Sequence, residues 1–376
     1  MKKANSTTIG AAAAALFLLA ILPGSGTASE VTFKGNVIYM EKDNLSLAKK
    51  FELAHKEFKK EKTYDAYFTG YIFLSRHDVQ FGDEGRTGQP YKLYVKEGRI
   101  KLRRTWKEGF SSKTDTSEEG GSPAGVVFLH NGKNGNIEDV RHIDLEETYA
   151  VEDFPFYWFG KADNGESFAF MTHQFEKAEP HKQDEFIFFI GSHVFPKACD
   201  ILRKVALGSY PSKARESAIF WLGSNTYDKS LDYLREIYRK EGSTKMREKV
   251  IFSLYILGGD TAVRELIDIA RYDKSSKVRK QAIFWLGQRA SKECVKALKD
   301  VIDDTDEETK VKESAVFAIS QLPKEECVPL LIEIARSNKN PKVRENAIFW
   351  LGQKDDEKAL KFFEEILLKK KGPSPH

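Results

Sequence analysis

The sequence predicts an α+β multidomain protein in which an N-terminal β-rich domain is followed by an α-α solenoid. Three observations lead to this class. A motif recurs at a nearly constant interval through the C-terminal half, aromatic and β-branched segments with Gly and Asn turns precede it, and a basic then apolar segment opens the chain. With 376 residues the chain also exceeds the usual size of one compact domain, which favours two domains or one elongated array.

Residues 1–29 are expected to be a secretory signal peptide. Met1-Lys2-Lys3 is basic, the stretch from Ile9 to Leu22 is uncharged and apolar, and small residues follow Pro23. The apolar run is shorter than the roughly 20 residues that cross a bilayer, so we expect cleavage near Ser29, with an uncleaved anchor as the alternative. The chain is therefore expected to be exported to the periplasm of a bacterium or outside the cell, and to touch a membrane only if the signal is retained.

Residues 30–157 are expected to form the β-rich domain. An amphipathic segment from Leu45 to Lys62 predicts one helix, and residues 67–74 are aromatic and β-branched, as in a strand. Two hairpins are expected after it, the first pairing residues 91–95 with 99–105 and the second pairing residues 126–130 with 137–143. Residues 111–125, which are rich in Ser, Thr, Glu and Gly, are expected to be a loop.

A repeat of about 32 residues predicts a solenoid over residues 158–369, before a basic, proline-containing tail at 370–376. Consecutive anchors of the repeat are 32, 32, 32, 33 and 32 residues apart: Gln183, Arg215, Arg247, Arg279, Lys312 and Arg344. Each unit has two apolar helix-period segments, so it would bury its apolar face against its neighbours. Residues 157–160, Tyr-Trp-Phe-Gly, have the same form and predict that the array begins there, capped by the β domain.

The repeat resembles the HEAT-repeat family, specifically the short bacterial HEAT-like repeats of the phycobilin-lyase-associated type. The resemblance rests on Val278-Arg279, Val311-Lys312 and Val343-Arg344, each followed by Ala and, in the first and last, by Leu-Gly. It implies a HEAT-like superhelix that serves mainly as a binding surface. It also implies a ladder of cross-repeat hydrogen bonds between anchors and acids, formed by Arg215, Arg247, Arg279, Lys312, Arg344, Asp273 and Asp306.

Charge and motif content argue against several function classes. The 60 Lys and Arg residues and 56 Asp and Glu residues are interleaved, so no nucleic-acid partner is expected. We find no Gly-x-Ser-x-Gly, no phosphate-binding glycine loop and no Cys-x2-Cys pair, and therefore assign no catalytic residue and no cofactor. The alternative is an enzyme, or the regulatory subunit of one, with its chemistry in the β domain near His130 and His142.

Neither the histidines nor the cysteines near or within the array predict a metal or disulfide site. His173, His181 and His193 lack the spacing of a zinc helix, so no metal is expected. Cys294 and Cys327 occupy a column that holds Ala or Ser in the other units. Equivalent positions in stacked repeats should be about 8–10 Å apart, which is too far for a disulfide, so small buried thiols are expected.

A column of phenylalanines predicts the functional surface. Each unit has a Phe five residues after its anchor: Phe188, Phe220, Phe252, Phe284, Phe317 and Phe349. With 100° per residue, Phe284 lies in the middle of the polar face of its helix, between Lys280 and Gln288, away from Trp285. Such a stripe on the concave side predicts the binding of a protein or peptide partner.

Two other interpretations of this column remain open. The rings could stack on one another inside a tightly curved array and add stability only, or the stripe could pack against the N-terminal domain or a second copy of the chain. The sequence does not specify the oligomeric state. Trp221, Trp285 and Trp350, which alternate with Ser253 and Ala318, are expected in the core, because a large residue beside a small one allows adjacent layers to pack closely.

Overall fold

The computed structural model describes residues 31–42, 44–76, 91–96, 98–103, 121–145, 147–225 and 227–369. The expected signal peptide and C-terminal tail lie outside the described residues, as does the expected loop up to residue 120. Residues 122–125, which we expected at the end of that loop, instead belong to a strand.

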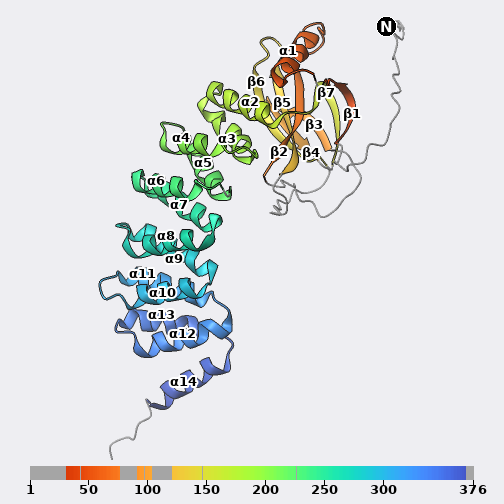
Figure 1. Ribbon diagram of the computed structural model, residues 1–376. Helices are drawn as coiled ribbons and strands as arrows, with labels where there is room; N and C mark the ends of the chain where they lie inside the picture. Colours follow the sequence, from red (N-terminus) through yellow and green to blue (C-terminus); the bar gives the residue numbers. More distant parts are fainter. Residues whose placement is uncertain are drawn as a thin grey trace, which may run out of the picture.

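In the described residues, the N-terminal part is one sheet of strands with a helix beside it (Figure 1). The strands are β1 Thr32–Tyr39, β2 Ala66–Ser75, β3 Tyr91–Lys96, β4 Arg99–Arg103, β5 Ser122–Asn131, β6 Ile137–Ile143 and β7 Thr148–Lys161. Their order is β4-β3-β7-β2-β5-β6, and β1 also pairs with β7. The two expected hairpins are present as the antiparallel pairs β3–β4 and β5–β6.

The sheet curls so that its outer strands approach each other. β4 contacts β6, and the backbone N–H of Ile100 donates a hydrogen bond of 2.8 Å to the buried carboxylate of Asp139. An apolar cluster that includes Phe68, Phe156 and Trp158 packs against the strands from one side. The opposite side of β2 and β5 packs against helix α1, Leu47–Phe58, through the larger cluster that continues into the array.

The array begins later than the sequence predicts. Residues 157–160, which we expected in the first helix, belong to β7, and the first helix of the array begins at Asn164. Phe156 and Trp158 point into the cluster of the sheet, whereas Tyr157 and Phe159 point into the cluster shared with the helices. A strand that is buried on both faces has a continuous apolar sequence, and periodicity alone does not distinguish it from a buried helix.

The C-terminal part is a stack of helix pairs that extends away from the sheet (Figure 1). Its helices, with one 3-10 turn, are α2 Asn164–Lys177, η1 Pro180–Lys182, α3 Gln183–Ser192, α4 Ala198–Leu207, α5 Ser212–Ser224, α6 Ser230–Lys240, α7 Thr244–Leu257, α8 Gly259–Tyr272, α9 Ser276–Arg289, α10 Lys292–Asp303, α11 Thr309–Ser320, α12 Lys324–Ser337, α13 Pro341–Gly352 and α14 Glu357–Lys369. Several helices begin at side-chain caps; Ser291 accepts a hydrogen bond from the Cys294 N–H, for example.

The helices of the array form two rows. The inner row consists of α3, α5, α7, α9, α11 and α13, and the outer row of α4, α6, α8, α10, α12 and α14. Adjacent inner helices contact each other more extensively than adjacent outer helices do. Helices lie closer together on the concave side of a curved stack, so this difference places the inner row on that side. Glycine permits the approach, since a Cβ on Gly223 would lie 2.5 Å from the backbone oxygen of Ser253.

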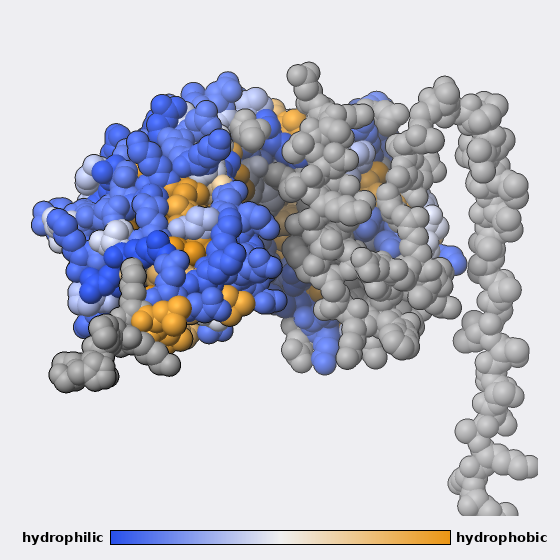
Figure 2. Space-filling view, turned by 90° about the horizontal axis from the view of Figure 1, so that it is seen from below, coloured by the Kyte–Doolittle hydropathy of each residue, from blue (hydrophilic) through white to orange (hydrophobic). Residues whose placement is uncertain are grey.

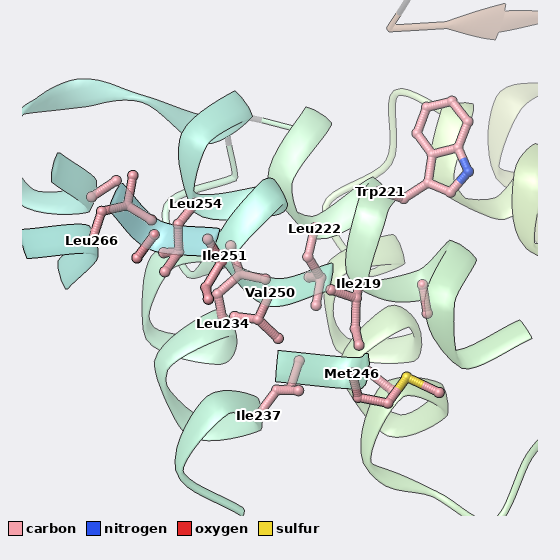
Figure 3. Packing of buried hydrophobic residues seen from close by; sticks show 14 of the residues in the cluster. Ile219, Trp221, Leu222, Leu234, Ile237, Met246, Val250, Ile251, Leu254 and Leu266 are labelled. Carbon is pink, nitrogen blue, oxygen red and sulfur yellow. The ribbon is translucent and has the colours of Figure 1, made fainter. Parts of the chain in front are cut away.

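Aliphatic side chains between the rows form the core of the array. Figure 3 shows Leu222, Leu234, Val250 and Leu254 gathered between α5, α6 and α7, whereas Trp221 lies apart from them. The three cysteines of the chain are buried and free, in agreement with the expectation for Cys294 and Cys327: Cys199, Cys294 and Cys327. Among the described residues, every helix is too short or too polar to traverse a bilayer.

The sheet is joined to the array by backbone hydrogen bonds as well as by packing. The end of β2 forms a β-bridge with the loop after α3, between Ser75 and His193. The N–H of Arg76 donates to the carbonyl of Ser192 at 2.7 Å, and the N–H of Val194 donates to the carbonyl of Leu74 at 3.2 Å. These bonds lie beside the shared apolar cluster, so the sheet covers the first helices of the array.

Candidate functional site

The phenylalanine column lies along the inner row, with one residue on each helix, but its members are not equally exposed. Phe220, Phe284 and Phe349 are 38%, 39% and 56% exposed. The other members are half-buried: Phe188, Phe252 and Phe317. Exposed and half-buried rings therefore alternate along the array. We call the surface that carries the three exposed rings the inner face.

The tryptophan column accounts for this alternation. Each Trp follows an exposed Phe on its own helix and covers the Phe of the preceding inner helix. The Trp285 ring centroid lies 4.9 Å from that of Phe252 and 5.0 Å from that of Phe284. The other two tryptophans have the same arrangement. The ring centroid of Trp221 lies 5.4 Å from that of Phe188 and 5.5 Å from that of Phe220. The ring centroid of Trp350 lies 5.1 Å from those of Phe317 and Phe349.

Lysines and glutamates border the phenylalanines at the N-terminal end of the inner helices. Lys245 Nζ lies 2.5 Å from Glu216 Oε1 on the preceding inner helix, and Lys277 Nζ lies 2.8 Å from Glu248 Oε1 in the same way. Because these pairs join neighbouring units, they form a partly exposed row along the inner face. Such pairs contribute little to stability but set the local charge.

A more buried set of ion pairs joins the inner helices to the loop of the next unit. The pairs are Arg215–Glu241, Arg247–Asp273 and Arg279–Glu307, each between an anchor and an acid of the following unit. The guanidinium of Arg279 binds both carboxylate oxygens of Glu307, at 2.8 and 2.7 Å, with side chains only 11% and 6% exposed. Bidentate geometry and burial make this the strongest of the three.

The expected ladder is therefore partly wrong in its members. The carboxylate of Asp273 pairs with Arg247, whereas Arg279 donates a hydrogen bond of 2.8 Å to the backbone carbonyl of Asp273. Asp306 takes no part in the ladder, because Glu307 occupies its place. Glu307 lies 28 residues after Arg279, whereas Glu241 and Asp273 lie 26 residues after Arg215 and Arg247.

The last two anchors form no ion pair with described residues. Lys312 is buried, and Arg344 donates to the backbone carbonyls of Asn338 and Lys339 at 2.7 and 3.0 Å. Asn338, the residue six positions before Arg344, carries no charge that could attract the ammonium of Lys312. The ladder of ion pairs thus extends over three units and ends before the C-terminal part of the array.

The two histidines of the alternative enzymatic interpretation are buried in the sheet. His130 Nε2 lies 2.7 Å from Thr69 Oγ1, its Nδ1 lies 3.0 Å from the carbonyl oxygen of Gly135, and its ring stacks on Tyr67. Burial lowers the pKa of His130 and of His142 to about 4. Both are therefore neutral near pH 7 and enclosed, whereas a general acid or base must reach a substrate.

His173, His181 and His193 differ in their surroundings, two on the surface and one in the junction between sheet and array. His173 and His181 are exposed on the surface, whereas His193 is buried at the junction, with its Nε2 2.7 Å from Ser167 Oγ. Ser167 in turn donates to the hydroxyl of Tyr71 at 3.1 Å. These buried hydrogen bonds connect Tyr71 on β2 with Ser167 on α2 and with His193 after α3, so they hold the sheet against the array. Within the described residues, no group of three His, Cys, Asp or Glu is placed to hold a metal ion.

A cavity of about 360 Å³ lies where α1, β7 and α2 meet, but three of its charged groups already have structural partners. Glu166 accepts a hydrogen bond of 2.7 Å from the N–H of Leu47 at the start of α1. Asp163 caps α2, and Lys50 donates to the carbonyl of Phe159 at 3.0 Å. These groups fix two helix starts against the sheet.

Sequence reasoning missed two features of the array. The first is a set of outer-row ion pairs between consecutive outer helices, such as Arg203–Glu236 and Arg235–Glu265, which a search for charges at the repeat period could have found. The second is an apolar patch at the far end, where Leu360, Leu367 and Leu368 are 60%, 66% and 68% exposed. Figure 2, which views the array from the α14 end, shows apolar patches within a largely hydrophilic surface.

Comparisons with known proteins concern the array. Residues 305–374 match the family profile of HEAT repeats. No curated protein sequence matches the chain. One similar solved structure is human deoxyhypusine hydroxylase in complex with glycerol, at 17% identity and TM-score 0.24, covering 54% of this chain and 87% of that one. Another is the complex of CpcE and CpcF of phycocyanin lyase from Nostoc sp. PCC7120, at 16% identity and TM-score 0.31, covering 57% and 90%. Neither structure assigns an activity to this chain.

Proposed function

We propose that this chain, whose C-terminal array is of the HEAT-repeat type, is an exported scaffold that binds a segment of a protein partner on its inner face. Solenoids of stacked repeats present extended concave surfaces, and such surfaces serve mainly for binding. The array fits this role because it exposes aromatic side chains on that side. The enclosed histidines of the sheet give the enzymatic alternative no support.

The exposed rings Phe220, Phe284 and Phe349 carry this proposal. They stand on every second inner helix, and each is held by the Trp beside it, at 5.5, 5.0 and 5.1 Å. An aromatic ring that is held in place loses little conformational freedom on binding. Covering the exposed part of each ring would contribute roughly 1 kcal/mol, so the three together are sufficient for a weak, specific interaction.

The test is a binding selection with matched variants. The mature chain is used to enrich a displayed library of random peptides, and the variant with Phe220→Ser, Phe284→Ser and Phe349→Ser is used in parallel. We expect enrichment with the unchanged chain and none with the variant, while the melting temperature stays within a few degrees. The control variant, Leu360→Ser with Leu367→Ser and Leu368→Ser, removes three exposed apolar side chains outside the inner face and should still enrich peptides.

Two results would contradict the proposal. If the unchanged chain enriches no peptides, the inner face is not a peptide-binding surface. A large fall in melting temperature in the Phe variant would mean that the exposed rings belong to the core, which is the stacking interpretation of the column.

Export is the second part of the proposal, and it is supported by the sequence of residues 1–29 alone. N-terminal sequencing of the protein from fractionated cells tests it. We expect a start near Ser29 or Glu30 in the fraction outside the cytoplasm, and an intact Met1 or Lys2 in the cytosol would refute export.

A further inference from the structure

The two rows of the array differ in charge. The last five inner helices, α5, α7, α9, α11 and α13, contain 13 basic and 4 acidic residues, a net charge of +9. The five outer helices α6, α8, α10, α12 and α14 contain 13 basic and 14 acidic residues, a net charge of −1. Loop carboxylates neutralise three of these inner charges, those of Arg215, Arg247 and Arg279, and the five helices still keep an excess of +6.

The positive charge is greatest on α9, in the middle of the row. This helix contains Lys277, Arg279, Lys280 and Arg289 and no acidic residue. Lys277 pairs with Glu248, Arg279 pairs with Glu307, and Arg289 donates to the carbonyl of Tyr255 at 2.9 Å. Lys280 forms no ion pair with any described residue.

Lys280 stands where the other inner helices have an acid. The equivalent residues are Glu216, Glu248, Glu313 and Glu345. Glu216 and Glu248 each bind the lysine of the next inner helix. On α9 the equivalent residue is Lys280, so Lys310 of the next inner helix has no such carboxylate. It pairs instead with Glu313 on its own helix, at 2.7 Å. The row of surface ion pairs is therefore interrupted at α9, and a positive charge remains at this point.

The same helix presents one of the three exposed rings. Phe284 follows Lys280 by four residues, so the ammonium and the ring lie on one face of the helix. Neighbouring helices pack about 8–10 Å apart, so exposed rings on alternate inner helices are roughly 16–20 Å apart. An extended chain covers about 3.3–3.6 Å per residue, so a spacing of about six residues would span this distance and keep the side chains on one side of the chain.

We propose, building on the proposed function, that the inner face binds an extended acidic protein segment. Its apolar side chains, about six residues apart, cover Phe220, Phe284 and Phe349, and a central carboxylate binds Lys280. A nucleic acid fits less well, because it carries a negative charge at every step. Along the rest of the face, Lys245, Lys277 and Lys310 are already paired with Glu216, Glu248 and Glu313, so they form no row of free positive charges that would match it.

The test uses the full mature chain and the displayed peptide library. Peptides enriched by the unchanged chain should contain more Asp and Glu than the starting library, together with apolar residues about six positions apart. The variant Lys280→Glu should still enrich peptides, without the preference for acidic ones. It should fold normally, because four other inner helices have Glu at this position. Lys361→Glu, the same charge change on the exposed side of α14, should keep the preference.

Two synthetic peptides then measure the preference by fluorescence anisotropy. They have the same apolar residues, and Asp at the centre of one is replaced by Asn in the other. We expect the unchanged chain to bind the Asp peptide about threefold to tenfold more tightly, as one charge-assisted contact near the surface predicts. The preference should disappear in the Lys280→Glu variant and weaken with added salt.

Other outcomes separate this inference from the proposed function. If the enriched peptides are neutral or basic and still require the three phenylalanines, the acidic segment is wrong and the proposed function stands. If no peptide is enriched, the proposed function fails as well. The occupant is a nucleic acid if a single-stranded oligonucleotide binds more tightly than the Asp peptide and depends on Lys280. It is a second copy if light scattering shows a dimer that the Phe variant loses.

Discussion

The last five helices of the inner row and the last five of the outer row each contain 13 basic residues, but the ion pairs of the two rows differ in burial. On the inner side, Arg279 and Glu307 form a bidentate pair with side chains 11% and 6% exposed. On the outer side, Arg336 and Glu365 form a pair with both side chains 55% exposed. Because water screens an exposed ion pair more than a buried one, we expect the buried inner pairs to contribute more to the stability of the array than the exposed outer pairs.

The first prediction compares these two pairs directly. Arg279→Ala leaves the carboxylate of Glu307 buried without its partner and should lower the free energy of unfolding by about 3–5 kcal/mol. Arg336→Ala removes an exposed pair and should change it by about 0–1 kcal/mol. Urea unfolding followed by circular dichroism measures both. If both substitutions lower the free energy of unfolding by the same amount, the burial of the two pairs does not determine their contribution to stability.

The second prediction concerns the close approach of the inner helices. A Cβ at position 223 would lie 2.5 Å from the backbone oxygen of Ser253, so Gly223→Ala should cost about 1–3 kcal/mol of stability. At Gly352 the nearest atom lies 3.8 Å from such a Cβ, on Phe363, and Gly352→Ala should stabilise by up to about 1 kcal/mol because Ala favours the helix. Opposite signs in thermal unfolding would confirm the contact, and a harmless Gly223→Ala would contradict it.

The third prediction distinguishes the two kinds of phenylalanine within the inner row. Phe252 is half-buried between Phe220 and Trp285, at ring distances of 6.4 and 4.9 Å, so Phe252→Ala should destabilise by about 1–2 kcal/mol. Phe349 is 56% exposed, and Phe349→Ala should cost less than about 1 kcal/mol while weakening peptide binding. If both substitutions lower stability equally, the exposed rings are part of the core.

The smallest expected effect is in the outer row and depends on pH. Hydrogen bonds from Arg203 and Lys240 lower the pKa of Glu236 from 4.5 to about 2. A lowered pKa in the folded state means that the pair stabilises above pH 4.5 and loses this contribution as the pH falls towards 2. An NMR titration of labelled Glu236 should show this pKa, and Arg203→Gln should raise it. The effect on stability should be small, because the site is open to solvent.

The sequence by itself determined the repeat and its two rows. The 32-residue interval, the helix-period apolar residues and the single Phe per unit identify the array and the helix face on which the phenylalanines lie. Turn residues likewise identified both hairpins, since Lys96-Glu97-Gly98 and Asn134-Gly135 interrupt segments with strand composition. These features follow from local conformation, which depends on neighbours in the chain.

Only the tertiary structure decided which side chains of each face are accessible and which charges meet. Phe252 and Phe284 have the same place in the repeat, but Trp285 covers the first from the next helix and leaves the second 39% exposed. In the same way, Asp306 has the sequence position of the expected acid, but it is Glu307 that pairs with Arg279. Periodicity defines the direction of a side chain from its own helix, whereas exposure and pairing depend on the adjacent helix and on the distance between the two.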